Sequence, residues 1–320
     1  MSAAFELDKA AKVYVAGHRG LVGSAITRRL RRDGYRNLVS RTSAELDLRD
    51  QAATYELFDR ERPKVVILAA AKVGGILANE AHPADFIADN LQIATNVITA
   101  AYRFGVRKLV NLASSAVYPP LAPQPLEERS LLSGQLEPTH RPYAIAKIAA
   151  IELCDAFRRQ HGSDFVTAVP TNLYGPGDSF DLRSGHVLPA LMRRFHEAKV
   201  AGAPVVEVWG TGTPRREFLH VDDLADAVVF MLRHVSRPGP INVGTGEDIA
   251  IHDLARLIAD VVGYEGEVVF DASKPDGAPR KLMDVGLLAS LGWRARIGLR
   301  EGIQQTYEWF KARPTRASVT

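Results

Sequence analysis

Cysteine is almost absent from this chain, which has Cys154 as its only thiol in 320 residues. A single cysteine excludes an intramolecular disulfide framework and a zinc site built from several thiolates. The nine histidines show no pairing at the spacing typical of metal ligands, so we expect no bound metal. The chemistry of the protein must therefore come from ordinary side chains and from whatever the fold binds.

Long apolar runs are also lacking, since no stretch approaches the roughly 20 residues that a helix needs to cross a bilayer. The charged segment 5–9 does not resemble a signal peptide, so we expect a cytoplasmic protein with no membrane partner. Forty basic against 37 acidic side chains give a net charge of only +3. This excess is too small to predict nucleic-acid binding, but it is compatible with a phosphorylated small molecule.

What the sequence does contain is an alternation of short apolar runs and helical segments. The predicted strands are 12–16, 37–41, 64–71, 108–113 and 164–169. The predicted helices are 24–33, 51–61, 83–104 and a segment that opens at Tyr143. Such alternation is typical of an α/β protein with a doubly wound, parallel (Rossmann-type) sheet and right-handed connections.

The composition changes after Gly177, where glycine, proline and arginine become frequent and the strands become short. We expect residues 1–177 to form a nucleotide-binding domain, segments within about 220–247 to return to it, and 178–320 to form mainly a smaller α/β substrate lobe. Five arginines gather there and favour an anionic substrate such as a diphosphate: Arg183, Arg193, Arg194, Arg215 and Arg216.

A glycine-rich turn follows the first predicted strand, with Gly17, Gly20 and Gly23 spaced three residues apart. Glycines at the junction of a strand and a helix allow the backbone to approach a pyrophosphate at the helix N-terminus. The pattern predicts a dinucleotide site formed by the turn and the residues within it: Gly17, Arg19, Gly20, Leu21, Val22 and Gly23.

The second predicted strand lacks the acidic residue that binds the ribose 2′-hydroxyl in NAD sites. Arg41 closes this strand instead, and Arg19 lies in the glycine turn. Two guanidinium groups suit a 2′-phosphate, so the sequence favours NADP(H) over NAD. Asp47 and Leu48 follow shortly afterwards, and we expect them near the adenine edge.

The candidate catalytic residues are Ser114, at the end of a buried strand, and Tyr143 and Lys147 on the next helix. Residues four apart on a helix share one face, so the phenol and the ammonium of this pair can point to one place. A nearby cation is expected to lower the pKa of the phenol. The three side chains predict a proton-transfer site for a carbonyl or an alcohol.

These motifs together resemble the extended short-chain dehydrogenase/reductase family and, within it, the GDP-L-fucose synthases. The resemblance covers nearly the whole chain and rests on segments 16–20, 70–75, 142–147, 170–176, 215–222 and 273–277. It implies conversion of GDP-4-keto-6-deoxy-D-mannose to GDP-L-fucose with NADPH, by epimerisation at C3 and C5 and reduction of the C4 ketone. It also implies a homodimer built from a four-helix interface.

The resemblance assigns roles residue by residue. Tyr143 protonates the C4 oxygen, Lys147 is its electrostatic partner and a ribose ligand, and Ser114 donates its hydroxyl. Substrate contacts are implied for Asn172, Arg194, Trp209, Arg216 and Lys281.

Epimerisation next to a ketone requires one group to remove a proton and another to return it on the opposite face. The resemblance supplies His186 as one of these groups, but Ala116 stands where the family has its catalytic cysteine. Cys154 cannot replace it, because eleven helical residues separate it from Tyr143 by about 16 Å. We interpret Cys154 as a small buried hydrophobe.

Three hypotheses follow. The first is a GDP-4-keto-sugar reductase in which epimerisation is weakened, restricted or lost. The second is a bifunctional GDP-L-fucose synthase that uses water, Ser115 or another side chain as its missing acid or base. The third is a non-catalytic NADP-binding scaffold protein, which the complete Ser, Tyr and Lys set disfavours.

Overall fold

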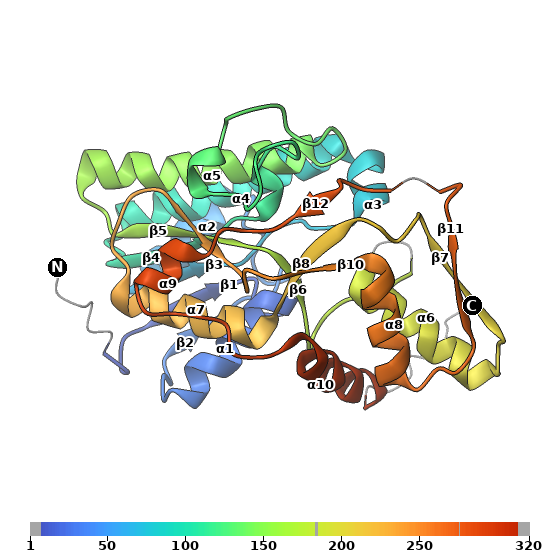
Figure 1. Cartoon of the computed structure of the whole chain (residues 1–320). Coiled ribbons are helices and arrows are strands. Elements are labelled where there is room, and N and C mark those ends of the chain that lie inside the picture. The colour runs from blue at the N-terminus through green and yellow to red at the C-terminus, as the bar shows by residue number, and fades with distance from the viewer. Residues whose placement is uncertain (1–7, 183–184, 275, 313–320) are drawn as a thin grey trace.

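The computed structural model describes residues 8–182, 185–274 and 276–312. Its larger sheet has six parallel strands in the order β2-β1-β3-β4-β5-β9 (Figure 1). These strands are β1 (Val13–Ala16), β2 (Leu38–Val39), β3 (Val65–Leu68), β4 (Lys108–Leu112), β5 (Phe165–Pro170) and β9 (Pro240–Val243). The doubly wound parallel fold predicted from the sequence is confirmed.

Helices cover both faces of this sheet, which explains why its central strands are continuous apolar runs. One face packs against α1 (Leu21–Arg32) and α7 (Val221–His234). The other face packs against α2 (Gln51–Glu61), α4 (Pro83–Arg103) and α5 (Arg141–His161). Figure 1 shows α4 and α5 above the sheet and α1 and α7 below it.

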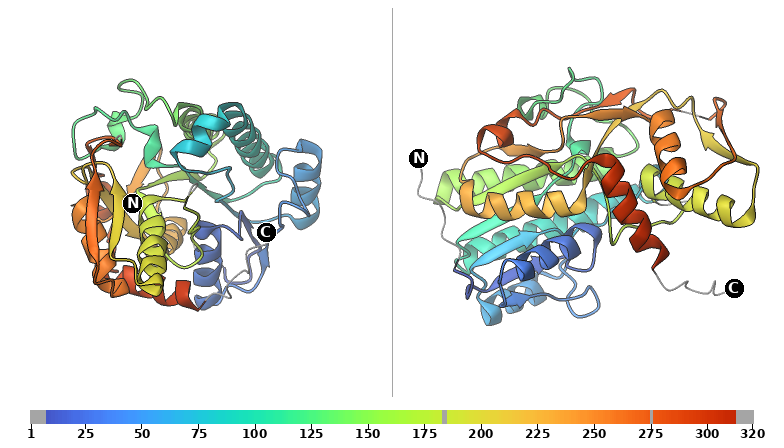
Figure 2. Two further views of the ribbon diagram at one scale, coloured as in Figure 1. Left: turned by 90° about the vertical axis from the view of Figure 1, so that its right-hand side faces the viewer. Right: turned by 60° about the horizontal axis from the view of Figure 1, so that its bottom comes forward.

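The smaller lobe lies beside the carboxyl ends of these strands (Figures 1 and 2). Its mixed sheet has the order β10-β8-β12, with β6 paired to β8, and a separate pair joins β11 to β7. The strands are β6 (Asn172–Tyr174), β7 (Val205–Trp209), β8 (Arg215–His220), β10 (Asp248–Ala250), β11 (Glu267–Asp271) and β12 (Arg280–Lys281). The helices α6 (Val187–Ala201), α8 (Ile251–Val262) and α10 (Leu299–Lys311) complete a separate apolar core.

Four short helices lie in the connections: α3 (Ile76–Ala81), η1 (Ser115–Val117), η2 (Glu128–Ser130) and α9 (Gly286–Ser290). The sequence pattern did not predict α3 or α6. Of the residues described, none belongs to a helix long and apolar enough to cross a membrane. Within the same residues, no cluster of histidine, cysteine or acidic side chains could hold a metal ion.

Several predicted boundaries were wrong. Helix α1 begins at Leu21 instead of Ser24, because Gly20 adopts an extended conformation and serves as the N-cap. Strand β2 ends at Val39, so Arg41 lies in the following loop and does not close the strand. Helix α5 begins two residues before Tyr143, and it accommodates Pro142 because the first turn of a helix needs no backbone donor.

Candidate active site

The glycine turn lies at the point where the strand order reverses between β1 and β3, which is where open α/β sheets bind ligands. Gly17 has φ +84°, and a Cβ there would lie 2.7 Å from the backbone nitrogen of Ala70, just after β3. A Cβ on Gly23 would lie 2.2 Å from the Gly17 carbonyl oxygen. These two positions therefore require glycine for the turn to close.

Gly20 has a different role, because the nearest atom to an added Cβ there is 3.5 Å away. It caps α1 without a side-chain hydrogen bond, and the first turn of α1 carries no acidic residue. Leu21 and Val22 pack against the core, while Arg19 is exposed. A helix N-terminus of this kind, free of competing carboxylates, fits a pyrophosphate.

Hydrogen bonds from the Thr42 backbone and side chain lower the pKa of the Glu45 carboxyl, and the charges of Arg41 and Arg19 lower it further. Each arginine therefore lies near Glu45. Arg41 also pairs with Glu61, at 2.8 Å between Nη2 and Oε1. The two arginines thus border one small region of the β2–α2 loop, as a 2′-phosphate site would require.

Asp47 and Leu48 lie further along the same loop. The Asp47 carboxylate accepts a hydrogen bond from Arg49 Nη2 at 2.7 Å. The Leu48 carbonyl oxygen accepts one from Asn96 Nδ2 at 2.9 Å. Both residues fix the loop against its surroundings, and their contact with adenine stays a prediction.

Ser114, Tyr143 and Lys147 come together at the carboxyl end of β4. A hydrogen bond joins the side chains of Ser114 and Tyr143. Lys147 Nζ lies 5.8 Å from the centre of the Tyr143 ring and donates to the Leu112 carbonyl oxygen at 2.8 Å. The edge-to-face contact of Phe86 with Tyr143, at 6.4 Å between ring centres, holds the phenol from the side of α4.

The predicted lowering of the phenol pKa was wrong. Burial raises the pKa of Tyr143 to about 12, against the smaller opposing effect of the Ser114 hydrogen bond. Burial also lowers the pKa of Lys147 to about 8, so the charge of its own ammonium is disfavoured. The low polarity that surrounds both groups outweighs their attraction. At neutral pH the phenol is therefore protonated, which is the form of a proton donor.

His186 is the N-cap of α6, and its ring is reached by solvent. The surrounding protein atoms still lower the pKa of its imidazole, and the charge of His140 lowers it further. Ala116 lies in η1 and is half-buried. Cys154 is fully buried, as predicted, and burial raises the pKa of its thiol to about 12.

The predicted substrate residues Arg216 and Lys281 lie directly opposite one another on the parallel strands β8 and β12. Burial lowers the pKa of Lys281 to about 8, with the Arg216 charge acting in the same direction and Glu137 against it. Two like charges side by side are unfavourable unless an anion joins them. Asn172, on β6, donates to the Glu217 carbonyl oxygen at 2.8 Å and ties β6 to the same sheet.

The arginines of the smaller lobe divide into two groups. Arg193 and Arg215 form ion pairs with Glu197 and Asp248. Arg194 and Arg216 donate to the backbone carbonyl oxygens of Glu207 and Arg215, at 2.7 and 2.8 Å. A carbonyl carries no full charge, so these bonds do not neutralise the two guanidinium groups. Arg183 lies outside the described residues.

Trp209 ends β7 with 59% of its surface exposed. Lys274 Nζ lies 5.6 Å from the centre of its indole ring. An exposed indole beside a cation presents a flat apolar face, on which a purine base can stack.

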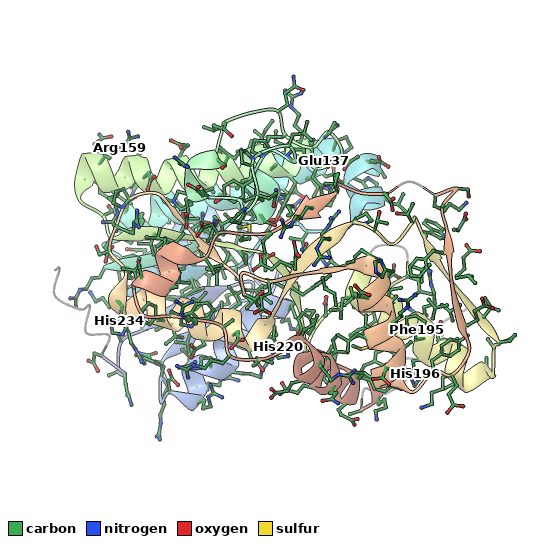
Figure 3. All side chains as sticks on the ribbon, viewed as in Figure 1. Glu137, Arg159, Phe195, His196, His220 and His234 are labelled. Carbon is green, nitrogen blue, oxygen red and sulfur yellow. The ribbon has the colours of Figure 1, made fainter. Side chains whose placement is uncertain are left out.

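Sequence reasoning missed a second polar group, formed by Glu137 and His140 just before α5. The His140 Nδ1 atom lies 2.8 Å from Glu137 Oε2. Figure 3 places Glu137 near β12, at the edge of the larger domain that faces the smaller lobe. The spacing of a glutamate and a histidine three residues apart was visible in the sequence, but nothing there indicated a site.

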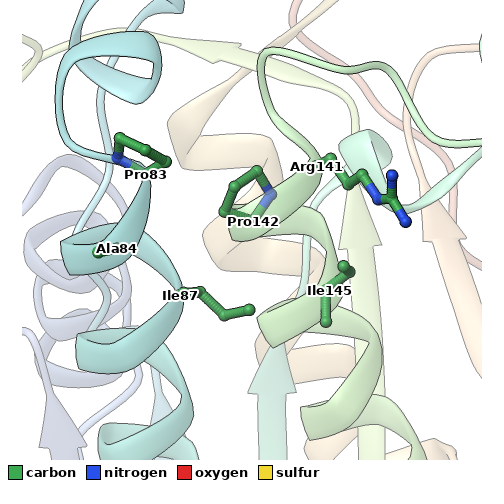
Figure 4. Close-up of a pocket in the computed structure, with 6 residues that line it drawn as sticks. All are labelled: Pro83, Ala84, Ile87, Arg141, Pro142 and Ile145. Atoms are coloured by element: carbon green, nitrogen blue, oxygen red, sulfur yellow. The ribbon is translucent and has the colours of Figure 1, made fainter.

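A shallow pocket lies between the first turns of α4 and α5 (Figure 4). It is lined by Pro83, Ala84, Ile87, Arg141, Pro142 and Ile145. The lining is mostly apolar, which is more typical of a surface that packs against protein than of one that binds a charged sugar nucleotide.

A dinucleotide-binding sheet with a serine, a tyrosine and a lysine at its carboxyl edge defines an NAD(P)-dependent oxidoreductase of the short-chain type. Comparison with known proteins supports this class of enzyme. Residues 13–244 match the model of the NAD dependent epimerase/dehydratase family. The chain belongs to this family and, within it, to the group of GDP-L-fucose synthases.

The relatives that place it there match almost the whole chain. GDP-L-fucose synthase 1 of Arabidopsis thaliana is 60% identical over 95% of this chain and 94% of its own length. GDP-L-fucose synthase of Escherichia coli K12 is 54% identical over 93% and 96%. A solved structure of a GDP-mannoheptose C4 reductase from Campylobacter jejuni, with NADP bound, has a TM-score of 0.87 and 40% identity over 95% and 99%.

Proposed function

We propose that this enzyme reduces the C4 ketone of a GDP-linked 4-keto-6-deoxy-mannose-type sugar with NADPH. The observation that carries the proposal is the Ser114–Tyr143–Lys147 group, which lies at the same carboxyl edge of the parallel sheet as the glycine turn. NADPH supplies the hydride when it is bound. The named relatives support the choice of a GDP-linked sugar.

The chain's own residues supply the proton that the C4 oxygen receives during reduction. The phenol of Tyr143 is protonated at neutral pH and can donate to the C4 oxygen as negative charge develops there. Ser114 hydrogen-bonds to the phenol and can also donate to the same oxygen. Lys147, whose ammonium donates to the Leu112 carbonyl oxygen, is the electrostatic partner of Tyr143 and a ligand of the cofactor ribose in this proposal.

Substrate binding falls to the smaller lobe. Arg216 and Lys281 form an adjacent pair of cations for the diphosphate, and Arg194 adds a third cation. Trp209 offers a stacking face for guanine, and Asn172 lies on the strand between the two lobes. On the cofactor side, Arg19 and Arg41 favour NADPH over NADH, and Asp47 and Leu48 border the adenine.

A second candidate is the complete GDP-L-fucose synthase reaction. The identity of 60% to the Arabidopsis protein favours it. Ala116 has no proton to exchange, so epimerisation would need a group other than the cysteine of the family. We also propose a homodimer in which α4 and α5 pack against the same helices of a second copy, covering the apolar pocket of Figure 4.

The test is incubation of the protein with GDP-4-keto-6-deoxy-mannose and NADPH, followed by determination of the product's stereochemistry. A C4-reduced sugar with the original C3 and C5 configuration supports the reductase alone, and GDP-L-fucose supports the second candidate. The GDP-linked 4-keto heptose substrates of related reductases should be run in parallel. No NADPH oxidation with any GDP-4-keto hexose or heptose would refute both candidates.

A further inference from the structure

Epimerisation requires two proton-transfer groups, and only one of them has been assigned to a residue. His186 is available as one proton-transfer group, but the half-buried Ala116 cannot be the other. A replacement must be able to carry a proton and must lie near His186. His140, which pairs with Glu137, meets both requirements, and the inference drawn from it rests on the second candidate function.

The Glu137 carboxylate is held by several donors. Oε1 accepts from the Thr139 backbone at 3.1 Å, and Oε2 accepts from the His140 backbone at 2.9 Å. Oε2 also lies 2.8 Å from His140 Nδ1. Burial favours the protonated acid, yet these hydrogen bonds outweigh it and lower the pKa of Glu137 to about 2. Glu137 is therefore a fixed anion at every physiological pH.

The Glu137 carboxylate beside Nδ1 determines which nitrogen of the His140 ring carries the proton. Nδ1 carries a proton and donates it to Glu137, so Nε2 is the nitrogen left free for proton transfer. The carboxylate also orients the ring, as in a histidine–aspartate pair of a serine hydrolase. The imidazole is 26% exposed, which leaves it accessible to a ligand.

The position of His140 suits a role in catalysis. It is the N-cap of α5 and precedes Tyr143 by three residues, so it lies one helical turn from the phenol. It also lies close enough to His186 for its charge to lower the pKa of that ring. Glu137 lies close enough to Lys281 for its negative charge to raise the pKa of that ammonium, against the larger opposite effect of burial. His140 thus lies at the start of the helix that carries Tyr143 and near the histidine that caps α6.

We propose that His140, oriented by Glu137, is the second proton-transfer group of this enzyme and works with His186 on the carbons next to the C4 ketone. Neutral His186 removes the proton from the carbon, and the C–H electron pair moves into an enolate. Protonated His140 then delivers its Nε2 proton to the opposite face of the same carbon. The sugar keeps its composition, and solvent returns both histidines to their starting states.

Deuterium exchange into GDP-4-keto-6-deoxy-mannose in D2O, without NADPH, measures this step separately from reduction. The wild-type enzyme should exchange the C3 and C5 protons, and His140→Asn should slow that exchange by about 10²- to 10⁴-fold. His140→Gln serves as a second variant. The matched control is His161→Asn, at the other end of α5, where the ring stacks on Tyr102; it should exchange at the wild-type rate.

Reduction provides the internal check on folding. His140→Asn should still oxidise NADPH with the keto sugar, and its product should keep the original C3 and C5 configuration. Glu137→Gln should weaken exchange less than His140→Asn does and should shift its pH profile.

Exchange by His140→Asn and His140→Gln at the wild-type rate, or no exchange by the wild-type enzyme, would overturn the role of His140. Failure of the wild-type enzyme to oxidise NADPH would instead overturn the proposed reductase, whatever the exchange shows.

Discussion

The catalytic corner, formed by Ser114, Tyr143 and Lys147, and the basic strand pair, formed by Arg216 and Lys281, solve different problems. In the catalytic corner the polar groups are satisfied by one another and by nearby backbone, as in the bond from Lys147 to the Leu112 carbonyl oxygen. In the strand pair two cations stand side by side on β8 and β12. In the proposed function the first arrangement positions a proton, and the second binds the anionic diphosphate.

Different structural elements hold the side chains of the two regions in place. The catalytic corner depends on one helix and one strand end. The basic strand pair depends on the buried carboxylate of Glu217, which accepts from the Met283 backbone at 2.8 Å and from the Thr245 backbone at 2.6 Å. Variants of the corner should therefore change kcat, and variants of the strand pair should change KM for the nucleotide sugar.

The largest effect is expected for Tyr143→Phe. Loss of the phenolic proton should lower kcat by about 10²- to 10⁴-fold, the usual contribution of general acid catalysis. KM for the sugar should change little, because the ring and its contact with Phe86 remain. Steady-state NADPH oxidation measures both constants, and Tyr55→Phe, on the remote helix α2, is the control. A change in KM alone would mean that Tyr143 only binds substrate.

Gly23→Ala should weaken cofactor binding, since its Cβ would lie 2.2 Å from the Gly17 carbonyl oxygen and force the turn open. Overpacking of this kind costs about 1–3 kcal/mol, which corresponds to roughly 5- to 150-fold in the Kd for NADPH. Gly20→Ala is the matched control, because the nearest atom is 3.5 Å away. Fluorescence titration with NADPH compares the two. Equal affinities would contradict the turn described above.

Arg216→Gln should raise KM for the GDP-sugar by about 10- to 100-fold, given 1.5–3 kcal/mol for a hydrogen bond to a charged group. The turnover rate at saturating sugar should stay within a few-fold of wild type. Arg215→Gln is the control on the same strand, since Arg215 pairs with Asp248 instead. If the Arg215 variant were the weaker binder, the assignment of the basic strand pair would be wrong.

The smallest expected effect is a dependence of KM for the sugar on pH. Burial and the Arg216 charge lower the pKa of Lys281 to about 8, so the ammonium is charged below this pH and neutral above it. KM for the sugar should therefore rise as pH increases through about 8, by up to roughly tenfold for the loss of one partly screened charge. In Arg216→Gln the midpoint should move to higher pH. A KM that does not vary with pH would contradict a role for Lys281 in binding.

The sequence predicted the fold and the grouping of Ser114, Tyr143 and Lys147 because both depend on local spacing, and the catalytic role of the three residues stays a prediction. Gly17 and Gly23 follow a strand directly, and Tyr143 and Lys147 share a helical face. The pairing of Arg216 with Lys281 could not be predicted, since it arises from strands far apart in the chain. The Tyr143 pKa was predicted in the wrong direction, because burial is a property of the packed structure. The position of His140 relative to His186 depends in the same way on how the two lobes meet.

The most direct test of the reductase uses NADPH carrying deuterium at the transferable position of the nicotinamide, with GDP-4-keto-6-deoxy-mannose as substrate. The product, examined by NMR, should carry deuterium at C4 and hydrogen from solvent on the C4 oxygen. The Tyr143→Phe variant should form the same labelled product much more slowly. A product without deuterium at C4, or no product from the wild-type enzyme, would contradict the claim that this sheet edge is a C4 reductase site.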